Sequence, residues 1–102
     1  MELADYLCEI DNTHKTFIAE KNKKPYMEGH HIIHMRLQEK FSSSLDIYAN
    51  IICLCPICHR LLHYGLRTQK TAILYEIYEM RKERLMKSGI KISKNDFVEL
   101  LQ

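Results

Sequence analysis

The chain has 102 residues, of which 46% are hydrophobic, and a formal net charge of +2. This length predicts one small domain over residues 1–102, with a modest core that a structural metal would stabilise. Its apolar runs are only a few residues long, which excludes a membrane-spanning helix, and the mild positive charge permits a nucleic-acid partner without arguing for one.

The first predicted feature is a zinc knuckle to which the N-terminal segment contributes. Four cysteines without a secretory signal indicate a reducing, cytoplasmic environment, where the C-x-x-C pair Cys55 and Cys58 is first interpreted as two zinc ligands. Tetrahedral zinc needs four ligands, and Cys8 is the natural third. His14 and Asp11 are both candidates for the fourth, and we prefer His14 because Asp is the rarer structural ligand.

A first strand is predicted over residues 26–33, where aromatic and β-branched side chains are frequent. His30 and His31 then point to opposite faces of this strand unless the backbone bulges between them. Glu28 shares the face of His30 and can orient a histidine, although an exposed strand residue is the simpler interpretation.

Residues 34–49 form a long connection, in which a local helix is expected over residues 35–40. A second, buried strand follows at residues 51–54, and Cys53 within it is interpreted as a core residue. Asn50 stands at the entry to this strand, where an asparagine usually hydrogen-bonds neighbouring backbone groups.

A helix is predicted to start at Pro56, which suits the first helical position, and to stop at Gly65. His59 and His63 are four residues apart, so both imidazoles lie on one helical face and can share a metal ion or a phosphate. The paired histidines of the first strand are the candidates to meet them.

Two helices are predicted in the C-terminal extension, residues 66–102. The first is expected to be capped by Thr68 and to run to about Lys87, with Gly89 as its terminating glycine. Ser93 is expected to cap the second. The basic side chains near the end of the first helix are interpreted as a solvated face: Arg81, Lys82, Arg84 and Lys87.

Several separate blocks of the sequence together resemble the HNH endonuclease family, in its zinc-containing branch that includes modified-cytosine restriction nucleases. The blocks are Gly29-His30-His31-Ile32-Ile33, Asn50-Ile51-Ile52, Leu54-Cys55-Pro56-Ile57-Cys58-His59-Arg60 and His63-Tyr64-Gly65. The resemblance covers about residues 8–65. It implies an α+β fold with a ββα-metal core, which here would carry a zinc knuckle and C-terminal helices.

The resemblance also implies roles for individual residues. His31 matches the general base, and His30 matches a metal ligand. Asn50 matches the asparagine that fixes the loop between the strands, and a backbone carbonyl near it is expected to accept a hydrogen bond from His31. His59 matches the final catalytic histidine, a metal ligand, and His63 a further metal or phosphate ligand.

Two positions depart from the family pattern. Asp11 stands where a second cysteine of the first knuckle is usual, and His34 stands where proline is common.

The implied activity is metal-dependent hydrolysis of DNA, in a bacterial or phage-like context, with 5′-phosphate and 3′-hydroxyl products. Imidazole ligands admit Mg²⁺, Mn²⁺, Ni²⁺ or Zn²⁺ as the catalytic cation, in addition to the structural zinc. One such site cuts one strand, so a double-strand break would require a homodimer or a larger assembly.

Two other function classes compete with this interpretation. A non-catalytic zinc module that binds nucleic acid or protein would explain the cysteines but would leave four histidines and Asn50 without a shared purpose. A redox protein would use Cys55 and Cys58 as a dithiol, but the expected βαβ setting is missing.

Overall fold

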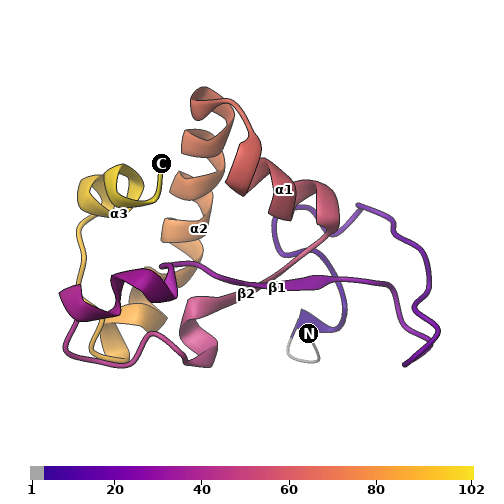
Figure 1. Cartoon of the computed structure of the whole chain (residues 1–102), viewed down its shortest axis with the longest axis horizontal. Helices are drawn as coiled ribbons and strands as arrows, with labels where there is room; N and C mark the ends of the chain where they lie inside the picture. The colour runs from indigo at the N-terminus through magenta and orange to yellow at the C-terminus, as the bar shows by residue number, and fades with distance from the viewer. Residues whose placement is uncertain (1–3) are drawn as a thin grey trace.

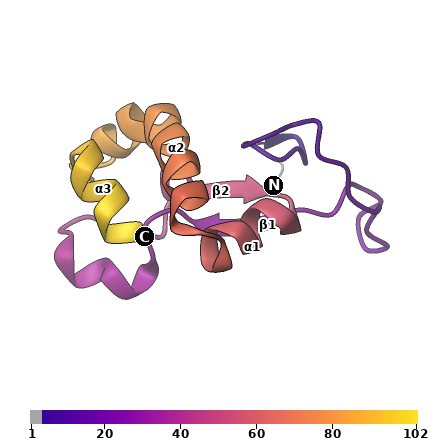
Figure 2. The same ribbon diagram turned by 90° about the horizontal axis from the view of Figure 1, so that it is seen from above.

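The computed structural model describes residues 4–102 and combines a two-stranded antiparallel sheet with three α-helices and two short 3-10 helices (Figure 1). Along the longest axis, α3 lies toward one end, α2 follows, and the sheet with α1 comes next. The N-terminal segment lies at the other end (Figure 2). The elements in chain order are β1 (Glu28–His31), η2 (Met35–Lys40), η3 (Tyr48–Asn50), β2 (Ile51–Leu54), α1 (Pro56–Tyr64), α2 (Arg67–Lys87) and α3 (Lys94–Leu101).

The two strands pair over four residues, with His30 opposite Ile52 and His31 opposite Ile51. β1 is therefore shorter than the strand predicted over residues 26–33, whereas β2 spans the predicted residues 51–54. Ile52 and Cys53 point to opposite faces of the sheet, and both are buried, so β2 is covered on both sides. β1 instead buries His30 and leaves His31 partly exposed.

The start of α1 is determined by the C-x-x-C pair itself. Cys55 is the N-cap residue, and its sulfur accepts a hydrogen bond from the backbone N–H of Cys58 at 3.4 Å. Pro56 occupies the first helical position, where its missing N–H has no cost. The helix ends before Gly65, as predicted, and carries His59 and His63 one turn apart.

Asn50 is fully buried and closes the long connection between the strands. Its side-chain oxygen accepts a hydrogen bond from the Ile33 N–H at 2.9 Å. Its amide nitrogen donates to the carbonyls of Ile33 and Leu45 at 3.0 and 2.8 Å. One side chain thus ties together the end of β1, the loop before η3 and the start of β2.

Arg81 corrects the prediction of a wholly solvated basic face on α2. Arg81 is only 4% exposed, whereas Lys82, Arg84 and Lys87 are exposed as expected. The guanidinium donates to the carbonyls of Ala49 and Ile51, at 2.9 Å each, and to a Glu9 carboxylate oxygen at 2.7 Å. The charge of Arg81 predicted an exposed side chain, but its guanidinium is tolerated inside the protein because these oxygens accept its hydrogen bonds.

The predicted end of α2 and the predicted start of α3 are observed, whereas the predicted start of α2 is not. Thr68 does not cap α2, because the helix already begins at Arg67 with Leu66 as its N-cap residue. Gly89 follows the end of α2 with a φ of 87°, the left-handed conformation that glycine adopts without strain. Ser93 caps α3 as predicted, accepting from the Asp96 N–H at 3.2 Å.

The predicted fold class is confirmed: two antiparallel strands followed by a helix give the ββα order, and α2 and α3 follow it. Phe97, Val98 and Leu101 of α3 and Leu74, Ile77 and Leu85 of α2 contribute to the common core. Within residues 4–102, the longest helix is too polar to cross a lipid bilayer.

We predict that Arg81→Met lowers the free energy of unfolding by about 3–5 kcal/mol, because it leaves the Glu9 carboxylate and the loop carbonyls without their donor. Urea unfolding of the zinc-loaded protein, followed by circular dichroism, measures this change. Arg84→Met, at an exposed position of the same helix, should stay within about 0.5 kcal/mol of the parent. Equal urea midpoints for Arg81→Met and the parent would contradict the prediction. If the chain is one domain, the parent should unfold in a single cooperative transition.

Candidate functional site

Four predicted zinc ligands meet beside the N-terminus of α1. One ligand atom from each of Cys8, His14, Cys55 and Cys58 lies within 4.8 Å of the others. The Nδ1 atom of His14 is 3.3 Å from the Cys55 sulfur and 3.4 Å from the Cys58 sulfur. A sulfur and a nitrogen bound to one tetrahedral zinc are separated by about 3.5 Å, so this Cys₃His cluster has the dimensions of a zinc knuckle.

Asp11 lies behind His14 rather than among the sulfurs. Its carboxylate oxygen is 3.3 Å from the Nε2 atom of His14, the ring nitrogen that points away from the cluster. A carboxylate in this place orients the imidazole and favours the tautomer whose Nδ1 carries the lone pair. The structure therefore brings His14, and not Asp11, into the ligand set.

The thiols of Cys8 and Cys53 differ in their surroundings. Burial raises the pKa of Cys8, but hydrogen bonds from backbone N–H groups of Cys55, Asp11 and Ile10 offset this, so its pKa is lowered overall. Burial raises the pKa of Cys53 to about 11, so this thiol stays protonated at neutral pH. Cys53 lies in the hydrophobic core, as predicted.

Three histidines from β1 and α1 form a second cluster. Nitrogen atoms of His30, His59 and His63 lie within 4.8 Å of one another. The Nε2 atoms of His59 and His63 are 3.2 Å apart, close to the roughly 3.3 Å expected for two imidazoles on one tetrahedral metal ion. The set can therefore hold a divalent cation with its side chains nearly as they stand.

Glu28 contacts this cluster, and the exposed-strand interpretation of it is wrong. Its Oε1 atom is 2.8 Å from Nδ1 of His59, and its Oε2 atom accepts a hydrogen bond from the Tyr26 hydroxyl at 2.8 Å. The hydrogen bond with His59 and then that with Tyr26 lower the pKa of Glu28. The carboxylate is therefore ionised and directs the Nε2 lone pair of His59 toward His63.

His31 lies outside the second cluster, on the other face of β1. Its Nε2 atom is 3.0 Å from a carboxylate oxygen of Asp46, which takes the place of the backbone carbonyl expected near Asn50. Sequence reasoning missed Asp46 because it lies in the irregular connection, 15 residues from its partner. The pairing fixes the orientation of the ring at the end of the strand.

Burial lowers the pKa of two imidazoles of the second cluster, those of His30 and His63. Burial, followed by the neighbouring His59, lowers the pKa of His30 to about 3. Burial also lowers the pKa of His63 and of His34, whose ring centroid is 5.8 Å from that of His30. Neutral rings offer lone pairs without first losing a proton, which favours metal binding.

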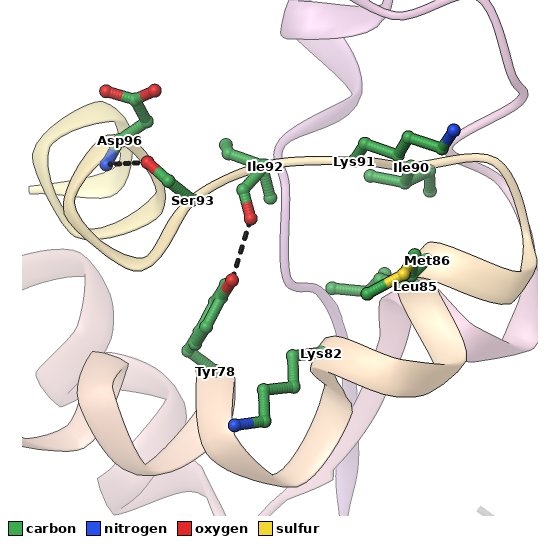
Figure 3. Close-up of a pocket in the computed structure, with 9 residues that line it drawn as sticks. All are labelled: Tyr78, Lys82, Leu85, Met86, Ile90, Lys91, Ile92, Ser93 and Asp96. Atoms are coloured by element: carbon green, nitrogen blue, oxygen red, sulfur yellow. Dashed lines mark hydrogen bonds between the residues drawn. The ribbon is translucent and has the colours of Figure 1, made fainter.

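Two hollows differ in their relation to the histidines. One, of about 430 Å³, includes His63 among its lining residues and so adjoins the second cluster. The other, of about 540 Å³, lies between α2 and α3 and shares no residue with either cluster (Figure 3). A hydrogen bond from the Tyr78 hydroxyl to the Ile92 carbonyl, 2.8 Å long, crosses this second hollow. This second hollow is therefore not part of the histidine site.

The chain is similar to known proteins over part of its length. Residues 18–65 match the family model of the HNH endonucleases. The chain is 36% identical over 81 residues to the type IV methyl-directed restriction enzyme EcoKMcrA of Escherichia coli strain K12. The match covers 79% of this chain and 26% of that relative, so the chain spans about a quarter of the relative's length. No solved structure matches the chain significantly. The family model thus identifies an HNH endonuclease domain at residues 18–65 of the chain.

Proposed function

We propose that this chain is a metal-dependent endonuclease of the restriction type, which hydrolyses phosphodiester bonds in DNA. The observation that carries the proposal is the convergence of three imidazoles, those of His30, His59 and His63, at metal-binding distance. His31, which follows His30 in β1, is paired with Asp46. The HNH family match and the restriction-enzyme relative support the same reaction class.

The two clusters are assigned different metals. The Cys₃His cluster of Cys8, His14, Cys55 and Cys58 has the donor types of structural zinc. His30, His59 and His63 would hold the catalytic cation, and all-imidazole donors suit Zn²⁺ or Ni²⁺ better than Mg²⁺ or Mn²⁺, which prefer oxygen. When bound, that cation would supply positive charge where negative charge develops on the phosphate.

His31 is proposed to be the general base. If its Nε2–H donates to Asp46, the lone pair is on Nδ1, and Nδ1 is the atom that would accept a proton from the attacking water. The Asp46 carboxylate stabilises the imidazolium that results, as a carboxylate does for the histidine of a catalytic triad. Asn50 is a positioning residue, because its hydrogen bonds to Ile33 hold the end of β1 in place.

The competing functions explain less of the structure. A non-catalytic zinc module needs only the first cluster, whereas the second cluster with Glu28, and His31 with Asp46, suit hydrolysis. A redox dithiol must be accessible to its partner thiols, but Cys55 and Cys58 are only 1% and 4% exposed. One active site cuts one strand, so we propose that a double-strand break requires two copies of the chain, as a homodimer or within a larger assembly.

We expect the parent to nick supercoiled plasmid in the presence of Mn²⁺, Ni²⁺ or Mg²⁺, and His31→Ala to nick about 10²–10⁴-fold more slowly, because the base is missing. Zinc content and thermal stability should match those of the parent. Plasmids from methylating and non-methylating hosts, assayed side by side, test the restriction-type assignment. A His31→Ala rate equal to that of the parent would show that another group is the base.

Glu28→Gln should weaken binding of the catalytic cation by about 10–100-fold, because the ring of His59 loses its ionic partner. Calorimetric titration of the zinc-loaded protein with Ni²⁺ measures this affinity directly. Glu39→Gln, which removes an exposed carboxylate of η2, is the charge-matched control and should bind Ni²⁺ as the parent does. Unchanged Ni²⁺ affinity in Glu28→Gln would refute the orienting role.

Removal of zinc should unfold the protein, because a structural metal contributes directly to folding free energy. We expect the thiols to react slowly with a chromogenic reagent until a chelator is added, and all four cysteines to react afterwards. Cys58→Ala should lose zinc and unfold, whereas Cys53→Ala should keep one equivalent of zinc. Rapid thiol reaction without a chelator would favour the redox alternative.

A further inference from the structure

A groove beside the histidine cluster combines side chains from three parts of the chain. His34 precedes η2 and Arg36 lies in it, His63 belongs to α1, and Lys70 belongs to α2. The groove encloses about 430 Å³ and is completed by Leu62, Leu101 and Gln102. Because His63 belongs both to the groove and to the candidate metal set, the two sites are continuous.

The groove carries positive charge that no neighbouring carboxylate side chain compensates. Its lining, as far as residues 4–102 describe it, includes Arg36 and Lys70 but neither Asp nor Glu. Within residues 4–102, the lysines and arginines that form salt bridges are others, namely Lys23, Arg81, Lys82 and Lys94. A single cation such as Arg36 or Lys70 could be an ordinary solvated surface residue. Two cations from separate elements that line one concave site, together with imidazoles, indicate an anion-binding site.

His34 adds a hydrogen-bonding group between the two sites. Its ring centroid is 5.8 Å from that of His30 and 6.2 Å from that of His63, with which it is stacked. A neutral imidazole can donate one N–H, so His34 offers an anion a donor at the boundary between the groove and the histidine cluster. This gives a physical reason for a histidine at a position where the family resemblance implied proline.

We propose that the groove formed by His34, Arg36 and Lys70 binds a DNA backbone phosphate adjacent to the one that would be cleaved at His30, His59 and His63. The inference rests on the proposed nuclease function and extends it to substrate binding. The planar guanidinium of Arg36 can bind two phosphate oxygens at once, whereas the Lys70 ammonium acts as a point charge.

On this proposal, the HNH core and α2 both contribute to substrate binding. Lys70 lies outside residues 18–65, the part that matches the family model, so α2 supplies a substrate contact as well as support. A second phosphate contact also limits how the DNA strand can lie across the catalytic cluster, because two points on the backbone are then held.

Equilibrium DNA binding tests this proposal without any cleavage. The zinc-loaded full chain is titrated into a short fluorescein-labelled DNA duplex without added divalent metal. The titration is repeated at KCl concentrations from about 50 to about 200 mM, over which phosphate contacts change the affinity strongly. Each phosphate contact contributes about 0.9 to the slope of log K against log salt. The double variant Arg36→Gln/Lys70→Gln loses the one phosphate held in the groove, so it should bind more weakly and reduce that slope by about 0.9. Lys87→Gln, an exposed lysine at the far end of α2, should keep the parent's slope.

The outcomes separate this inference from the nuclease proposal. Loss of affinity and slope in the double variant, with thermal stability unchanged, supports the groove even if the parent fails to nick plasmid. Equal slopes for the parent and the double variant overturn the groove even if the parent is an active nuclease. A parent that does not bind the duplex at the lowest salt concentration also overturns it.

Discussion

The arrangement of this protein depends on an ion pair between the buried Arg81 and the partly buried Glu9. One oxygen of the Glu9 carboxylate accepts from Arg81 at 2.7 Å, and the other accepts from the Cys53 N–H at 2.7 Å. The same guanidinium also donates to the carbonyls on either side of Asn50. The pair therefore joins the N-terminal segment, the entry to β2 and α2, and a guanidinium this deeply buried is tolerable only while these acceptors remain in place.

That junction supports both candidate metal sites at once. β2 leads directly into the C-x-x-C pair, and α1 carries Cys58 and His59 as neighbours, one directed to each cluster. Adjacent residues of a helix point about 100° apart, so a single short helix can serve two sites on different sides of itself. A shift of α1 would consequently disturb both clusters. This links the zinc knuckle to the geometry proposed for catalysis.

Sequence reasoning succeeded where the relevant interactions are local. The C-x-x-C turn with Pro56 located the start of α1, Gly89 and Ser93 marked helix ends, and the spacing of His59 and His63 placed both rings on one face. It failed for Thr68, because α2 begins earlier without a side-chain cap. It also misjudged Glu28 and missed Asp46, since the partner of each lies in another segment, 31 and 15 residues away.

The residue types and short spacings of the chain were thus enough to indicate the ββα order, the family and the histidines and cysteines that could bind metals. Tertiary structure decided which carboxylate orients which imidazole, that His14 rather than Asp11 joins the sulfurs, and that Arg81 is buried. The physical reason is the range of the interactions. Helix caps and periodicity act within one or two turns, whereas a buried charge or a paired imidazole depends on segments up to 72 residues apart meeting in space.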